Sequence, residues 1–278
     1  MPGDLHTHTN FSDGSYSPEM LVFKAKEIGL HYLGITDDDT VDGIRHLYEN
    51  ELYPESGVNI IPGVELRANH PDTEVQIIGY NIDIYNEVLS DMINTVIEAR
   101  WERFSEIIKI LQREKFNIRE VDVLKVSGTS RSIGRSHIAR TLVKLGEFKS
   151  LNEVFDKILG KGCPAYLPRY LPTIDEIVDV IHRASGIAVL AQPKLIKNDE
   201  LVESLCTKMD GLEVYHPCNT INDTGNYEAL AQKYNLLMTG GSDFHGEPSR
   251  YVDKLGTFTV SDELSEQIYS KISTESRL

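Results

Sequence analysis

The sequence predicts an α/β fold in which strands and helices alternate around a parallel sheet or a barrel. Short apolar runs rich in β-branched residues recur along the chain, and polar residues end each of them. Helical patterns lie between most of these runs, and alternation of this kind favours a parallel sheet or barrel with helices outside. The expected strands cover residues 32–36, 58–64, 75–80, 187–191, 212–215 and 236–238.

Two helix starts carry clear signals. Ser17 precedes Pro18, a favourable first helical residue, and Gly29 lies past the expected end, so a helix of about three turns is predicted between them. Thr173 and Glu176 have the spacing of a capping box before a second helix.

Residues 87–160 interrupt the alternation, because their pattern is helical throughout. Ile107, Ile108 and Leu111 fall on one face of a long expected helix. Ile138 and Leu142 fall on one face of a later expected helix. A stretch of this length without a strand indicates a helical insertion, which leaves residues 1–86 and 161–278 for the barrel. We expect the insertion to pack on the rim of the barrel.

The composition of the chain argues against several classes of protein. The chain has 278 residues and a net charge of −15, which argues against a broad nucleic-acid-binding surface. Three cysteines without a Cys-x-x-Cys pair indicate neither a disulfide framework nor a thiolate zinc site. No apolar run approaches the roughly 20 residues of a membrane span, and the N-terminus lacks signal-peptide features. We therefore expect a cytoplasmic protein without membrane contact.

Acidic and histidine residues follow several of the expected strands. Asp4, His6 and His8 alternate, so an extended chain points them to one face. Parallel barrels build active sites at the carboxyl ends of their strands, where the other acids and histidines also fall. The further candidates are Asp13, Asp37, Asp38, Asp39, Glu65, Asp243 and His245.

Carboxylates gathered at one rim repel each other unless cations lie between them. Oxygen and imidazole ligands without thiolate suit Mn²⁺, Zn²⁺ or Fe²⁺, and Mg²⁺ is a further possibility for the most acidic position. Metal ions about 3.5–4 Å apart are a recurring device of phosphoester hydrolysis. The residues at this rim thus indicate a site for divalent metal ions.

The ordered motifs resemble those of the PHP (polymerase and histidinol phosphatase) superfamily of metal-dependent phosphoesterases. They are His6-Thr7-His8, Asp13, Thr36 to Thr40, Pro62 to Glu65 and Gly241 to His245. Gly134 to Arg140, Gly162 to Pro168 and Val189 to Pro193 are similar to the subgroup of nucleoside 3′,5′-bisphosphate phosphatases and 5′-to-3′ exoribonucleases.

The resemblance implies a distorted (β/α)7 TIM-like barrel whose rim holds up to three metal ions. It places His6, His8, Glu65 and Asp243 on the first ion and Asp13, Asp38 and His245 on the third, while Glu65 bridges toward the second. Asp243, His245 and Glu65 are the implied catalytic residues. Arg135 and His137 are implied to bind the phosphate of a small substrate, for which a nucleotide is the leading expectation.

Three positions depart from the family pattern, which usually has histidine at each. Asp38 remains an anionic ligand and favours a harder ion. Gln76 and Gln192 offer only amide oxygens to the second ion, so we expect two well-occupied metal sites and a third that is weak or absent.

Alternatives remain open. Loss of the second ion would also fit a phosphate-binding or nucleotide-binding protein with weakened or lost catalysis. A barrel metallohydrolase acting on C–N bonds shares the His-x-His opening but fits residues 134–140 poorly. Glu213 and His216 follow a strand, and packing is the favoured role for them over a place at the rim. The oligomeric state is not predicted.

Overall fold

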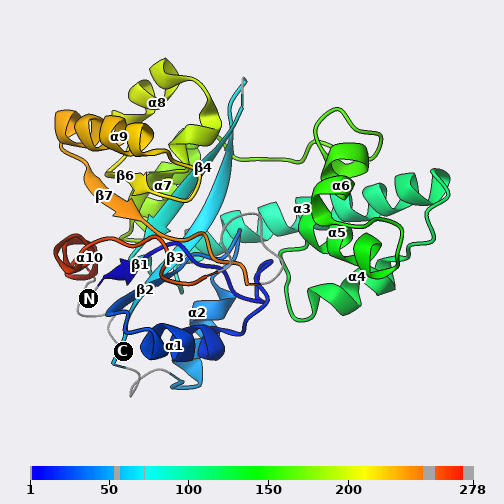
Figure 1. Cartoon of the computed structure of the whole chain (residues 1–278), viewed down its shortest axis with the longest axis horizontal. Coiled ribbons are helices and arrows are strands. Elements are labelled where there is room, and N and C mark those ends of the chain that lie inside the picture. Colours follow the sequence, from blue (N-terminus) through cyan, green and yellow to red (C-terminus); the bar gives the residue numbers. More distant parts are fainter. Residues whose placement is uncertain (1, 53–56, 72, 247–253, 272–278) are drawn as a thin grey trace.

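The computed structural model describes residues 2–52, 57–71, 73–246 and 254–271. In this part of the chain seven strands form one sheet in sequence order (Figure 1). The strands are β1 (Gly3–Asp4), β2 (Tyr32–Ile35), β3 (Asn59–Asn69), β4 (Glu74–Tyr80), β5 (Ile187–Ala191), β6 (Gly211–Tyr215) and β7 (Leu237–Gly240).

The two edges of the sheet approach each other. The Leu5 N–H donates to the Gly240 carbonyl at 3.2 Å, and the His8 N–H donates to the Phe244 carbonyl at 2.9 Å. Gly241 lies where these two edges meet. A Cβ added there would come within 2.3 Å of the His6 main-chain nitrogen, so only glycine fits. The sheet is therefore a nearly closed, distorted barrel with helices around it, as predicted.

The direction of β4 differs from the expected all-parallel arrangement. β4 runs antiparallel to both β3 and β5, while the other neighbouring strands are parallel. Only residues 70–73 join β3 to β4, which is too short for the crossover that parallel neighbours require. β3 also continues to Asn69, so Glu65 lies within the strand rather than at its end.

Helices cover the barrel and pack on its strands in two hydrophobic cores. They are α1 (Pro18–Glu27), α2 (Asp42–Glu49), α7 (Ile174–Arg183), the 3-10 helix η2 (Pro193–Ile196), α8 (Asp199–Cys206), α9 (Ile221–Tyr234) and α10 (Asp262–Tyr269). The Ser17 hydroxyl accepts from the Met20 N–H, and Thr173 forms the predicted capping box with Glu176. Both helix starts are confirmed.

Helices alone occupy residues 87–159 among the named elements, and Figure 1 shows most of them as a lobe beside the barrel. They are α3 (Glu87–Arg113), α4 (Glu120–Ser127), α5 (Arg135–Lys144), α6 (Leu151–Val154) and the π-helix η1 (Phe155–Leu159). The first half of α3 contributes Ile93 and Ile97 to the barrel core, whereas Phe104 and Leu111 pack in a separate core within the lobe. Helix α3 therefore ties the lobe to the barrel.

Among the described residues, no helix is both long enough and apolar enough to cross a membrane.

Candidate metal centre

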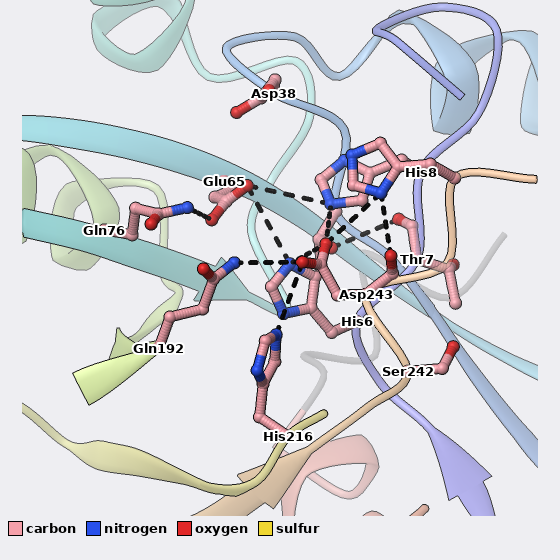
Figure 2. A network of polar contacts seen from close by, with 12 residues as sticks. His6, Thr7, His8, Asp38, Glu65, Gln76, Gln192, His216, Ser242 and Asp243 are labelled. Carbon is pink, nitrogen blue, oxygen red and sulfur yellow. Dashed lines mark hydrogen bonds and ion pairs between the residues drawn. The ribbon is translucent and has the colours of Figure 1, made fainter. Parts of the chain in front are cut away.

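The two N-terminal imidazoles lie fully buried beside two carboxylates (Figure 2). His6 Nε2 is 3.9 Å from Glu65 Oε2 and 3.5 Å from Asp243 Oδ1. His8 Nε2 is 3.8 Å and 3.2 Å from the same two atoms. Both Nε2 atoms lack a hydrogen-bond partner, although buried polar atoms are normally paired. Unpaired imidazole nitrogens facing carboxylate oxygens fit a divalent cation.

Glu213 fixes the orientation of His6. Its Oε1 lies 2.7 Å from His6 Nδ1, and its Oε2 accepts from the Gln192 main-chain N–H at 2.7 Å. A proton on Nδ1 leaves the lone pair of Nε2 directed into the site, which is how carboxylates orient metal-binding histidines. Burial acts to raise the pKa of Glu213, but His6 and His216 outweigh it and hold that pKa below its ordinary value. The carboxylate is therefore charged.

Asp243 presents its two oxygens to different neighbours. Oδ1 faces His6 and His8, whereas Oδ2 lies 3.4 Å from His216 Nε2 and 3.4 Å from the Gln192 side-chain nitrogen. Asp243, Gln192 and Asp39 all have left-handed backbones, with φ of 52°, 46° and 52°. Non-glycine residues in this region are strained and gather at functional sites.

Gln76 lies beside the other shared carboxylate. It sits on β4 opposite Arg67, and its side-chain amide donates to Glu65 Oε1 at 2.5 Å. Gln76 and Gln192 thus both direct N–H groups at carboxylates on the side where the family resemblance implies the second ion. Each N–H satisfies a carboxylate oxygen that a cation would otherwise approach.

The residues expected around the third ion are divided. His245 Nε2 lies 3.1 Å from Asp13, and its ring stacks on His8 at a centroid distance of 4.0 Å. Asp38 instead faces Arg67, with Nη2 at 3.4 and 3.5 Å from its two oxygens, and Figure 2 shows it outside the network of dashed contacts. Burial acts to raise the pKa of Asp38, but Arg67 outweighs it and lowers that pKa to about 2.

The ligand atoms of three groups of residues lie within 4.8 Å of one another in the described chain. These groups are His6 with His8 and Glu65, His8 with Asp243 and His245, and His6 with His216 and Asp243. Sequence reasoning favoured packing for Glu213 and His216, whereas the structure brings both into this centre. A charged residue in the middle of the apolar run 211–215 was the signal that could have revealed Glu213.

The expected phosphate-binding pair begins helix α5. His137 is buried, accepts from the Gly134 N–H at its Nδ1, and has Asp13 as an electrostatic neighbour. Burial lowers the pKa of His137 to about 4, so the ring is neutral at pH 7. Arg135 donates to the Leu159 carbonyl at 3.2 Å and packs over the rings of Tyr166 and Phe155.

Comparison with known proteins decides the family. The PHP domain matches residues 4–184. The chain belongs to the PHP domain family. A 5′-3′ exoribonuclease Rnm of Escherichia coli is 34% identical over 260 residues, which cover 90% of this chain and 87% of the relative. A 3′,5′-nucleoside bisphosphate phosphatase of Chromobacterium violaceum is 28% identical, with 90% of each protein covered.

Solved structures of this PHP protein's relatives agree with the fold. A crystal structure from Bifidobacterium adolescentis, assigned as a metal-dependent phosphoesterase, has a TM-score of 0.88 and 30% identity and covers 98% of both chains. An amidohydrolase from C. violaceum with bound sulfate has a TM-score of 0.87 at 24% identity, covering 98% of this chain and 97% of its own, and its likeness concerns the fold alone. Family membership makes this PHP protein a phosphoester hydrolase of the metal-dependent kind.

Proposed function

We propose that this PHP protein hydrolyses a phosphate ester of a small nucleotide or a short oligonucleotide. The observation that carries the proposal is the convergence of two unpaired imidazole nitrogens, from His6 and His8, on one oxygen each of Glu65 and Asp243. A divalent ion at such a site supplies a Lewis acid and lowers the pKa of a water that it binds.

The residues around this metal position orient its ligands and bind the phosphate group of the substrate. Glu213 keeps His6 in the tautomer that offers Nε2, and His8 stacks on His245. Arg135 supplies a fixed positive charge at the start of a helix, whose N–H groups also favour an anion. His137 is neutral at pH 7 and acts as a hydrogen-bonding group for the phosphate rather than as a cation.

Two metal positions have the stronger support. The first comprises His6, His8, Glu65 and Asp243, and the other is built around Asp13 and His245, with Asp38 as the ligand that must turn from Arg67. At the remaining position Gln76 and Gln192 present N–H groups, so its occupancy is expected to be weak. Mn²⁺, Zn²⁺ and Fe²⁺ suit the histidine-rich first position, and Mg²⁺ suits the more acidic one.

A nucleotide substrate has support from two relatives, one named an exoribonuclease and the other a nucleoside bisphosphate phosphatase. The net charge of −15 restricts phosphate recognition to local cations such as Arg135. A small or short substrate therefore fits this chain better than long nucleic acid.

The test is phosphate or nucleotide release by the metal-loaded protein from mononucleotides, a 5′-phosphorylated oligoribonucleotide and a panel of amides. Hydrolysis of phosphate esters that disappears in Asp243→Asn supports the proposal. Binding of nucleotide without turnover would instead favour the catalytically silent alternative, and turnover of amides alone would favour C–N hydrolysis.

A further inference from the structure

Asp4 is a buried carboxylate at the rim of the barrel that does not take part in the metal centre described above. It ends β1, two residues before His6, and it is fully buried. Among the described residues, the three groups of closely placed ligand atoms do not include it. A carboxylate removed from water needs hydrogen-bond donors or a counter-ion. The partners of Asp4 therefore indicate what it does.

Donors from two distant segments satisfy the Asp4 carboxylate. Its Oδ1 accepts from the Ser242 main-chain N–H at 2.9 Å, and its Oδ2 accepts from the Ser242 hydroxyl at 2.5 Å and from the Gly256 main-chain N–H at 2.8 Å. Each carboxylate oxygen thus accepts from a main-chain N–H. An asparagine side chain could not replace it, because in either orientation its amide N–H would face one of these main-chain N–H groups.

Ser242 directly precedes Asp243, whose carboxylate faces both imidazoles of the first metal position. Asp243 has a φ of 52°, and a non-glycine residue keeps a left-handed backbone only where the surrounding contacts hold it there. Such contacts lie on both sides of Asp243. Asp4 binds the N–H and the hydroxyl of Ser242, and the Phe244 carbonyl accepts from the His8 N–H at 2.9 Å. The Asp4 carboxylate therefore helps to fix the backbone of Asp243.

Close packing around Asp4 restricts the same loop further. A Cβ added to Gly241 would lie 2.7 Å from Asp4 Oδ1, so the chain passes directly against the carboxylate. Gly3, the residue before Asp4, exchanges two main-chain hydrogen bonds of 2.9 Å with Val260. Through Gly256, the carboxylate also binds the segment that leads to Val260. One side chain thus connects β1, the loop after β7 and the segment that follows Gly256.

We propose that Asp4 is a positioning residue for the first metal position, where it holds Asp243 in its ligating conformation by binding Ser242. In this role Asp4 touches neither the ion nor the substrate, and it acts on the ion only through Asp243. The alternation of Asp4, His6 and His8 would place all three among the ligands, but both oxygens of Asp4 face donors of the protein instead. This inference rests on the metal position of the proposed function and not on the identity of the substrate.

The experiment measures, by calorimetry, the affinity of folded variants for the first equivalent of Mn²⁺. Asp4→Asn should weaken this affinity about 10- to 100-fold, because an amide N–H then opposes a main-chain N–H and releases the loop. Ser242→Ala removes only the hydroxyl contact and should weaken the affinity about two- to fivefold. The double variant should lose less than the product of the two single losses, since both changes interrupt one connection.

Leu205→Ala is the control for a general loss of stability. Leu205 is buried in the barrel core on α8, so its truncation should lower the urea midpoint of unfolding while leaving the Mn²⁺ affinity at the wild-type value. Wild-type affinity in Asp4→Asn would overturn the proposal. An equal loss of affinity in Asp4→Asn and Leu205→Ala would also overturn it, because the role of Asp4 would then be structural only. If Asp4→Asn does not fold, Ser242→Ala decides by the same comparison.

These affinities do not depend on turnover, which separates the role of Asp4 from the proposed function. If the metal-loaded protein hydrolyses no phosphate ester, the proposed function fails while the Mn²⁺ affinities still test Asp4. A wild-type protein that binds no Mn²⁺ would overturn both. A crystal structure of Asp4→Asn adds a direct observation, since Asp243 should leave the left-handed region. An unchanged Asp243 backbone in that variant would contradict the proposal.

Discussion

The Gln76 amide donates to Oε1 of Glu65 at 2.5 Å, while Oε2 of the same carboxylate faces the Nε2 atoms of His6 and His8. Asp243 repeats this division, because Oδ1 faces the two imidazoles and Oδ2 lies near Gln192 and His216. Each shared carboxylate thus has one oxygen directed to the first metal position. Its other oxygen faces an N–H group where a second cation would be expected.

Restoring imidazoles at both glutamine positions should restore a cation. The double variant Gln76→His/Gln192→His is expected to bind one more equivalent of Mn²⁺ or Zn²⁺ per chain than the parent, because two neutral nitrogen ligands replace two N–H donors. Metal content after gel filtration measures this. An unaltered stoichiometry would count against it, and so would three fully occupied ions in the parent with both glutamine oxygens as ligands.

Removing a ligand of the first position should remove metal and turnover together. His6→Ala and Asp243→Ala are each expected to lower bound metal and to reduce phosphate release by at least 100-fold, since each removes a ligand that we propose for the first ion. His182→Ala serves as a control, because His182 is half-exposed and pairs with Asp210 away from the centre. Unchanged turnover in both site variants would exclude this position as the centre of the chemistry.

Asp39 should matter for stability. It is 1% exposed and pairs with the buried side chains of Arg100 and Arg169, so Asp39→Asn leaves two buried guanidinium groups without their counter-ion. Removing one partner of a buried pair costs about 3–5 kcal/mol of unfolding free energy. Urea unfolding measures the change. The exposed Asp179→Asn, which breaks a surface pair with Arg183, should cost less than about 1 kcal/mol.

His137 should make stability depend on pH. Burial lowers its pKa from 6.5 to about 4, so the folded chain takes up the proton only near pH 4, whereas the unfolded chain takes it up near 6.5. The free energy of unfolding should therefore fall as pH drops from 6.5 to 4, by on the order of 3 kcal/mol from this group. Relative to His137→Gln, metal-free wild type should lose that margin across this window, and a constant difference between the two would contradict the assignment.

Much of the barrel and the metal centre is predictable from the sequence because the signals are local. The strands are apolar runs with clear ends, and His6, His8, Glu65 and Asp243 each stand beside such a run. The antiparallel direction of β4 is not visible in apolar pattern alone. It follows from the short link 70–73, which leaves no room for a crossover helix.

Other features of the site could not be predicted, because they depend on contacts between segments that are far apart in the sequence. Five arginines that are electrostatic neighbours come from four segments with no shared motif, so only the fold brings them together; they are Arg67, Arg100, Arg103, Arg135 and Arg169. The position of Asp38 after an apolar run predicts a metal ligand, yet the guanidinium of Arg67, which faces it, belongs to a neighbouring strand. His216 reaches Asp243 because β6 and β7 are neighbours, which no spacing in the sequence indicates.

The most direct test of the metal centre is a crystal of this PHP protein loaded with Mn²⁺ and soaked with inorganic phosphate, with anomalous scattering recorded at the manganese edge. We predict a strong peak bounded by His6, His8, Glu65 and Asp243, a second beside Asp13 and His245, and phosphate between these ions and Arg135. Absence of a peak among the first four residues, or phosphate bound away from the ions, would contradict the account.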